Sequence, residues 1–145
     1  MVMNNLGPII IIEDDMDDQE LLAAVFHDLD YSNEIIFFND GYKALEFLNT
    51  KEINPFIILS DINMPRINGL ELRQKVKENE KLHLKCIPYL FFSTSNNQDL
   101  VINAYSACAQ GFFNKQNTYK ELSKTISCTM EYWLRCSAPN KFPAK

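Results

Sequence analysis

The chain has 145 residues, a net charge of -5 and ordinary globular fractions of hydrophobic (46%) and charged (23%) residues. We therefore expect one domain over 1–145, with a core over about 8–135 and a short tail over 136–145. The absence of any Lys/Arg cluster argues against a nucleic-acid surface, and apolar runs such as 9–12 are too short to span a membrane. Without a signal-peptide pattern, the protein is expected to be cytoplasmic.

The first predicted strand is an apolar run over 8–12, followed directly by acids. A run without alternation is typical of a strand buried on both faces of a parallel sheet. Apolar residues then recur at helical spacing over 21–29, which predicts an amphipathic helix. The later acids suit the cap and first turn of that helix, whereas Glu13 and Asp14 still belong to the strand end. These later acids are Asp15, Asp17 and Asp18.

The second predicted unit is a strand over 35–38 and a helix capped by Asp40. The third strand, over 56–60, is again wholly apolar until Ser60 and is followed by Asp61. A loop with Pro65 and an Asn-Gly pair follows, and a helix is expected over about 69–79 after a cap at Asn68. Ligands of open α/β sheets bind at the carboxyl ends of the strands, which is where Asp61 would lie.

The fourth predicted strand covers 87–92 and ends at Ser93. Ser95 and Gln98 have the spacing of a capping box for the next helix, which Gly111 is expected to end.

The fifth strand is expected over 112–114 and is followed by Lys115. Thr118 and Glu121 form another potential capping box for a last helix.

Five strands that alternate with five helices predict an α/β fold, a doubly wound parallel sheet with helices on both faces. The strand ends then converge on one edge of the sheet. They carry Glu13 and Asp14, Asp61, Ser93, and Lys115.

Carboxylates gathered at one edge repel one another, at a cost of roughly 4 kcal/mol per pair at about 4 Å and an effective dielectric near 20. A divalent cation with oxygen ligands offsets that repulsion, and a site with few protein ligands suits Mg²⁺. Lys115 supplies a further positive charge. A carboxylate, a metal, a hydroxyl and an ammonium together favour phosphoryl transfer onto Asp61.

This ordered set resembles the receiver domain of two-component response regulators over about 8–135. The matching residues are Glu13-Asp14, Asp61-x-x-Met64-Pro65-x-x-x-Gly69, Ser93 and Lys115. The resemblance implies a flavodoxin-like sheet of order 2-1-3-4-5. It also implies a single-domain, chemotaxis-regulator-like phosphoprotein of signal transduction, phosphorylated by a sensor histidine kinase or a phosphotransfer protein.

By the same resemblance, Asp14 and Asp61 would bind the metal directly, Glu13 through water, and Asn63 through its backbone carbonyl. Ser93 and Lys115 would act with Asp61 in phosphoryl transfer. Apart from its own phosphorylation and dephosphorylation, the protein would not be an enzyme.

Ser93 and Phe112 match the hydroxyl and aromatic positions of the family's switch. Phe112 has no hydroxyl, so its switch can only be one of packing. The output surface would comprise the fourth helix, fifth strand and fifth helix, with changes in hydrogen exchange around 96–119. It would bind a downstream protein or a second copy of the chain. The ending over 131–134 is similar to the last helix of small receivers that partner phytochrome-type and other sensor kinases.

One position departs from the family pattern, because Gln116 replaces the usual Pro after Lys115. A cis bond before a residue other than Pro costs roughly 3 kcal/mol, so we predict a trans bond.

Three other functions share part of this pattern. A degenerate receiver would bind partners without phosphorylation. A phosphatase of this layout would need a second acid at Asn63, and a flavodoxin would need a phosphate loop in place of the first acids.

Overall fold

The predicted strands form one five-stranded sheet in the order β2-β1-β3-β4-β5, and every neighbouring pair is parallel. This computed structural model describes residues 7–95 and 97–137. The strands are β1 (Ile9–Ile12), β2 (Ile35–Phe38), β3 (Ile57–Asp61), β4 (Tyr89–Ser93) and β5 (Gly111–Asn114). The predicted fold class and strand order are confirmed.

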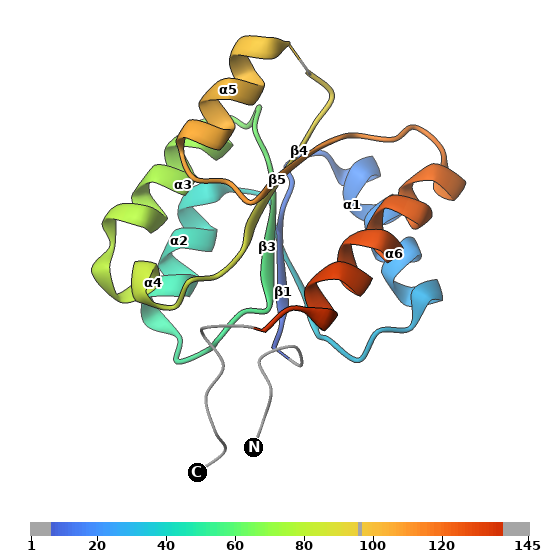
Figure 1. The fold of residues 1–145 in the computed structure, drawn as a ribbon, viewed down its shortest axis with the longest axis horizontal. Coiled ribbons are helices and arrows are strands. Elements are labelled where there is room, and N and C mark those ends of the chain that lie inside the picture. The colour runs from blue at the N-terminus through green and yellow to red at the C-terminus, as the bar shows by residue number, and fades with distance from the viewer. Residues whose placement is uncertain (1–6, 96, 138–145) are drawn as a thin grey trace.

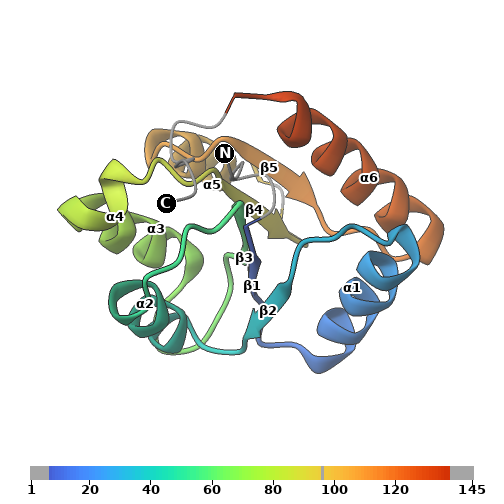
Figure 2. The ribbon, with the colours of Figure 1, turned by 90° about the horizontal axis from the view of Figure 1, so that it is seen from below.

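Helices cover both faces of the sheet (Figure 1; seen from below in Figure 2). One face carries α1 (Met16–Leu29) and α6 (Tyr119–Arg135). The other carries α2 (Gly41–Thr50), α3 (Gly69–Glu78), α4 (Glu80–Leu84) and α5 (Gln98–Ser106). No helix among the described residues is long and apolar enough to cross a membrane.

Alternate residues of β1 serve two separate cores. Ile10 and Ile12 pack with helices α2 to α5, whereas Ile9 and Ile11 pack with α1 and α6. All four side chains are at most 1% exposed. Successive side chains of a strand point to opposite faces, so a strand covered on both sides has to be apolar throughout. This requirement explains the unbroken run of isoleucines.

Most of the predicted helix caps are present. The Asp40 and Thr118 side chains accept hydrogen bonds from Tyr42 N and Glu121 N. Asn68 forms a complete capping box with Glu71 at the start of α3. The capping box at Asn68 fixes the end of the loop that connects β3 to α3.

The predicted cap at Ser95 is wrong. Asn97 caps α5, and its side-chain oxygen accepts a 2.8 Å hydrogen bond from Leu100 N. Ser95 instead donates its own backbone N–H to the hydroxyl of Ser93 at 3.1 Å. Ser95 therefore belongs to the turn that leaves β4.

The role predicted for Gly111 is also wrong, because Gly111 opens β5 and pairs with Leu90. Helix α5 ends earlier, at Ser106. Cys108, with φ of 65°, supplies the left-handed residue after the helix that glycine was expected to supply. The sequence prediction also missed α4, whose N-terminal cap is Asn79, the residue that is also the C-terminal cap of α3.

Candidate functional site

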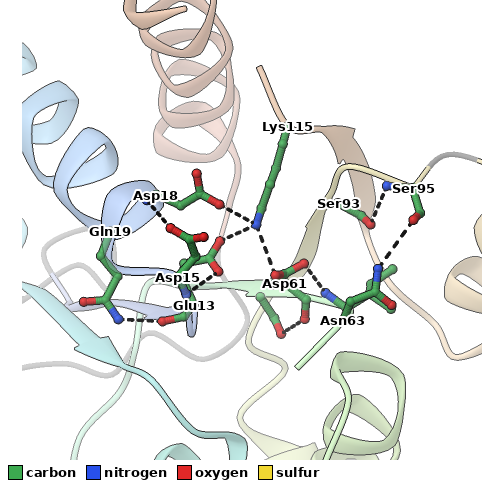
Figure 3. A network of polar contacts seen from close by, with 11 residues as sticks. Glu13, Asp15, Asp18, Gln19, Asp61, Asn63, Ser93, Ser95 and Lys115 are labelled. Carbon is green, nitrogen blue, oxygen red and sulfur yellow. Dashed lines mark hydrogen bonds and ion pairs between the residues drawn. The ribbon is translucent and has the colours of Figure 1, made fainter. Parts of the chain in front are cut away.

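The strand register brings the predicted site residues to one edge of the sheet. Ile12 pairs with Ser60, Asp61 with Phe92, and Ser93 with Asn114. The residues that follow these pairs therefore leave the sheet at the same level. Figure 3 shows that the side chains of Glu13, Asp61 and Lys115 point toward one another there.

Three carboxylates form the centre of the site. Glu13, Asp14 and Asp61 each offer an oxygen, and these oxygens all lie within 4.8 Å of one another. Glu13 is 2% and Asp61 7% exposed, whereas Asp14 is more accessible to solvent. Oxygen donors at this spacing suit a hard divalent cation, and the accessible side leaves room for water ligands. The residues therefore fit a divalent metal site.

Lys115 is the cation that faces this cluster. Its ammonium lies 2.5 Å from Glu13, 2.9 Å from Asp18 and 3.1 Å from Asp61. The backbone N–H of Lys115 donates to Ser93 O at 2.9 Å, which fixes the residue beside the end of β4. The bond between Lys115 and Gln116 is trans, as predicted. The ammonium thus reaches three acids through its side chain.

Burial and neighbouring charges together set the protonation of Glu13 and Lys115. Burial raises the pKa of Glu13 to about 7, and the charge of Asp61 acts in the same direction against the opposing effect of Lys115. Burial alone lowers the pKa of Lys115, but its hydrogen bonds to Glu13 and Asp18 and the charge of Asp61 raise it above its ordinary value. Lys115 therefore stays charged at neutral pH.

The backbone around Asp61 is held closely. Ile62 N donates to one carboxylate oxygen of Asp61 at 2.7 Å, and Gly69 N donates to Ile62 O at 2.8 Å. A β-carbon at Gly69 would lie only 2.1 Å from the carbonyl oxygen of Asp61. The connection from β3 to α3 can therefore close only over a glycine.

A hydroxyl-bearing turn borders the site on the other side. Ser93 is 0% exposed and accepts its hydrogen bond from Ser95 N, and the Asn63 side chain donates to the Ser95 hydroxyl at 3.5 Å (Figure 3). The contact joins the loops after β3 and β4. Its residues are 32 positions apart.

Sequence reasoning missed Ser95 and Asp18 as parts of the site. Asp18 was assigned to the first turn of α1, where it does lie, but it also binds Lys115. No sequence pattern marks either contact, because both depend on how separate elements pack.

Phe112, the predicted aromatic switch residue, lies half-buried in β5 on the face covered by α5. Its ring centroid is 6.4 Å from that of Phe91. The Phe112 side chain therefore packs against the core beneath α5.

Comparison with known proteins gives a consistent result. A family model described as the response regulator receiver domain matches residues 9–127. Response regulator Rcp1 of Synechocystis is 30% identical over 131 residues, covering 87% of this chain and 88% of that protein. The chemotaxis protein CheY of Pseudomonas aeruginosa is 27% identical over 123 residues, covering 85% of this chain and 95% of that protein.

Solved structures share the fold. The Mn²⁺-bound form of Rcp1 superimposes with a TM-score of 0.78 at 29% identity, covering 95% of this chain and 99% of that one. The phosphorylated cyanobacterial phytochrome response regulator RcpA gives a TM-score of 0.82 at 24% identity, covering 92% and 98%. At 24% identity, the match to RcpA shows similarity of fold alone.

Proposed function

The chain belongs to the response regulator receiver domain family, and from this premise we propose that it is a phosphorylation-switched binding module with Asp61 as its phosphoacceptor. The phosphoryl donor would be a sensor histidine kinase or a phosphotransfer protein. The observation that carries the proposal is the position of Asp61, which ends the central strand 3.1 Å from Lys115 and beside two further carboxylates.

The chain's own groups account for the transfer. A carboxylate oxygen of Asp61 attacks the phosphorus, a new O–P bond forms, and the bond from phosphorus to the donor nitrogen breaks as the electron pair returns to the imidazole. Lys115 would pair with the incoming phosphoryl oxygens. Its contacts with its present carboxylate partners would loosen at the same time. The Ser93 hydroxyl would donate to one of these oxygens in the product. Bound Mg²⁺ would neutralise negative charge on the phosphoryl group.

We assign the metal ligands to Asp14, Asp61 and the backbone carbonyl of Asn63, with Glu13 acting through water. The carboxylate spacing supports this assignment, as does the Mn²⁺ bound by the related Rcp1. The chemistry of oxygen ligands with open positions favours Mg²⁺.

The ligand assignment predicts different effects for two neighbouring acids. Asp14→Ala should weaken Mg²⁺ binding by more than about tenfold. Even mutation of a residue that only hydrogen-bonds a metal ligand lowers metal affinity by about 10–100-fold. Asp17→Ala should leave the affinity unchanged, since Asp17 is an exposed residue of the first turn of α1. Isothermal titration calorimetry separates the two. Equal losses would place the site elsewhere.

Mass spectrometry tests the function itself. Incubation with acetyl phosphate and Mg²⁺ should add one phosphoryl group to the intact chain, and chelation of the metal should prevent the addition. An unchanged mass under both conditions would instead support a degenerate receiver that binds partners without phosphorylation.

We propose that α5, β5 and α6 form the output surface, for a downstream protein or a second copy of the chain. These are the fourth helix, fifth strand and fifth helix of the sequence prediction, which lacked α4. Exposed apolar side chains on the helices support this assignment, with Ile102 50%, Tyr105 53% and Tyr132 62% exposed. Ser93, drawn toward the phosphoryl group, would open space into which Phe112 packs and shift α5 between two states.

This switch predicts a change in hydrogen exchange over 96–119 when beryllium fluoride, a phosphoryl mimic, is added with Mg²⁺; residue 96 lies outside the described residues. Phe112→Ala should remove the change in β5 and α5, since no ring remains to repack. If the mimic still changed hydrogen exchange in β5 and α5 of that variant, the result would contradict the packing switch.

A further inference from the structure

A buried tyrosine contacts Gly69, at the α3 end of the connection from β3 to α3, and Ser60, the residue before its β3 end. Tyr89 is 0% exposed, its hydroxyl donates to Gly69 O at 3.4 Å, and it lies next to the Ser60 side chain. Ser60 in turn donates to Asp61 O at 2.8 Å. Gly69 opens α3, and Asp61 ends β3. The phenol therefore holds Gly69 directly and lies beside the serine that holds the Asp61 carbonyl.

Arg73 of α3 extends this contact to α5. Its guanidinium carbon lies 5.4 Å from the centre of the Tyr89 ring. Its Nε and Nη2 donate to Ala107 O at 3.1 Å and Cys108 O at 3.0 Å. These carbonyls stand at the C-terminal end of α5, which attracts positive charge. The same side chain thus touches the tyrosine and the end of the helix.

The environment of Arg73 indicates that this arrangement is specific. The residue is 7% exposed, and within residues 7–95 and 97–137 it forms no ion pair with a carboxylate. Its buried charge is compensated by the α5 carbonyls and the aromatic face. Burial raises the pKa of Tyr89, so the hydroxyl keeps its proton and remains a donor.

We propose that Tyr89 is a positioning residue for phosphoryl acceptance and that Arg73 couples it to the C-terminal end of α5. The proposal rests on the assignment of Asp61 as phosphoacceptor. It adds a polar link that is distinct from the packing switch of Ser93 and Phe112, because it runs through α3 and reaches the opposite end of α5. Movement of the Asp61–Gly69 connection would then be transmitted to α5 by the contact of Arg73 with the Tyr89 ring and by the hydrogen bonds of Arg73.

Two conservative variants isolate the link. Tyr89→Phe removes only the hydroxyl, and Arg73→Met keeps the apolar stem but removes the guanidinium. Tyr42→Phe and Arg135→Met are matched controls, since they make the same changes on exposed side chains. Affinity for beryllium fluoride with Mg²⁺, hydrogen exchange of α5 at saturating mimic, and unfolding by urea are measured for each protein.

We expect Tyr89→Phe to weaken binding of the mimic by about fivefold or more, the lower end of typical coupling between sites. Arg73→Met should also weaken binding of the mimic, because coupling is reciprocal, and at saturation the mimic should no longer change exchange at residues 104–108. The double variant should lose less affinity than the two single losses combined, because both changes break one chain of contacts. The control variants should match the wild type.

Three results would overturn the inference. In the first, the variants lose stability in urea but keep wild-type affinity and a wild-type response of α5. In the second, the losses in the double variant are fully additive. In the third, the wild type fails to bind the mimic, and that result also removes the proposed function, so the two failures are distinguishable.

Discussion

Asp61→Asn is expected to abolish phosphorylation by acetyl phosphate, from one phosphoryl group per chain to none. The amide has nearly the shape of the carboxylate but lacks the anionic oxygen that attacks phosphorus. It also removes one of the three carboxylates that could hold the metal. Because Asn can still accept the hydrogen bond from Ile62 N, the fold should persist. Intact mass spectrometry gives the result directly.

Asp18→Asn is the matched control for this variant. Asp18 also binds Lys115, at 2.9 Å, yet it lies outside the carboxylate cluster around Asp61. The control should still gain one phosphoryl group, though its rate can differ because Lys115 loses a partner. Equal labelling of Asp61→Asn and Asp18→Asn would show that the phosphoacceptor is elsewhere.

Gly69→Ala is expected to destabilise the protein by about 3 kcal/mol, at the upper end of the usual cost of overpacking. The new methyl group would lie 2.1 Å from Asp61 O and 3.0 Å from the Ile62 α-carbon, and backbone atoms cannot move aside as a side chain can. Alanine favours a helix by up to about 1 kcal/mol over glycine, which is too little to offset this clash. The shift would also displace Asp61, so phosphorylation should fall.

Gly111→Ala makes the same change in a different setting. Its nearest neighbour would be the Leu90 Cδ2 methyl at 3.1 Å, the end of a flexible side chain. We expect a loss of less than about 1 kcal/mol, within the range of well-tolerated core changes. Urea denaturation of both variants tests the comparison, and similar midpoints would mean that the Asp61–Gly69 connection has room to relax.

The strands, and the meeting of the candidate site residues at one edge of the sheet, were predictable from local patterns, and the family resemblance supplied the strand order. The isoleucines of β1 can be buried on both faces only in the middle of a parallel sheet, and Asp61 then falls at a strand end. Once the order of strands was fixed, Glu13 and Lys115 had to meet at the same edge. No side-chain geometry was needed for these inferences.

Other features depend on contacts between distant segments. The Asn63 side chain meets Ser95 only because the loops after β3 and β4 leave the sheet together. The link from Tyr89 to Arg73 joins β4 to α3, and a tyrosine in an apolar strand resembles any other core residue in the sequence. Helix α4 has five residues, too few for a periodic pattern to indicate it.

The central claim is that the phosphoryl group resides on Asp61, and reductive trapping tests it most directly. Borohydride converts an aspartyl phosphate to homoserine, so the modified position can be read from peptide masses after treatment with acetyl phosphate and Mg²⁺. We predict homoserine at position 61 alone. Homoserine at position 14 or 18, or a stable phosphoryl group on His27 or His83 with none trapped at Asp61, would contradict the account.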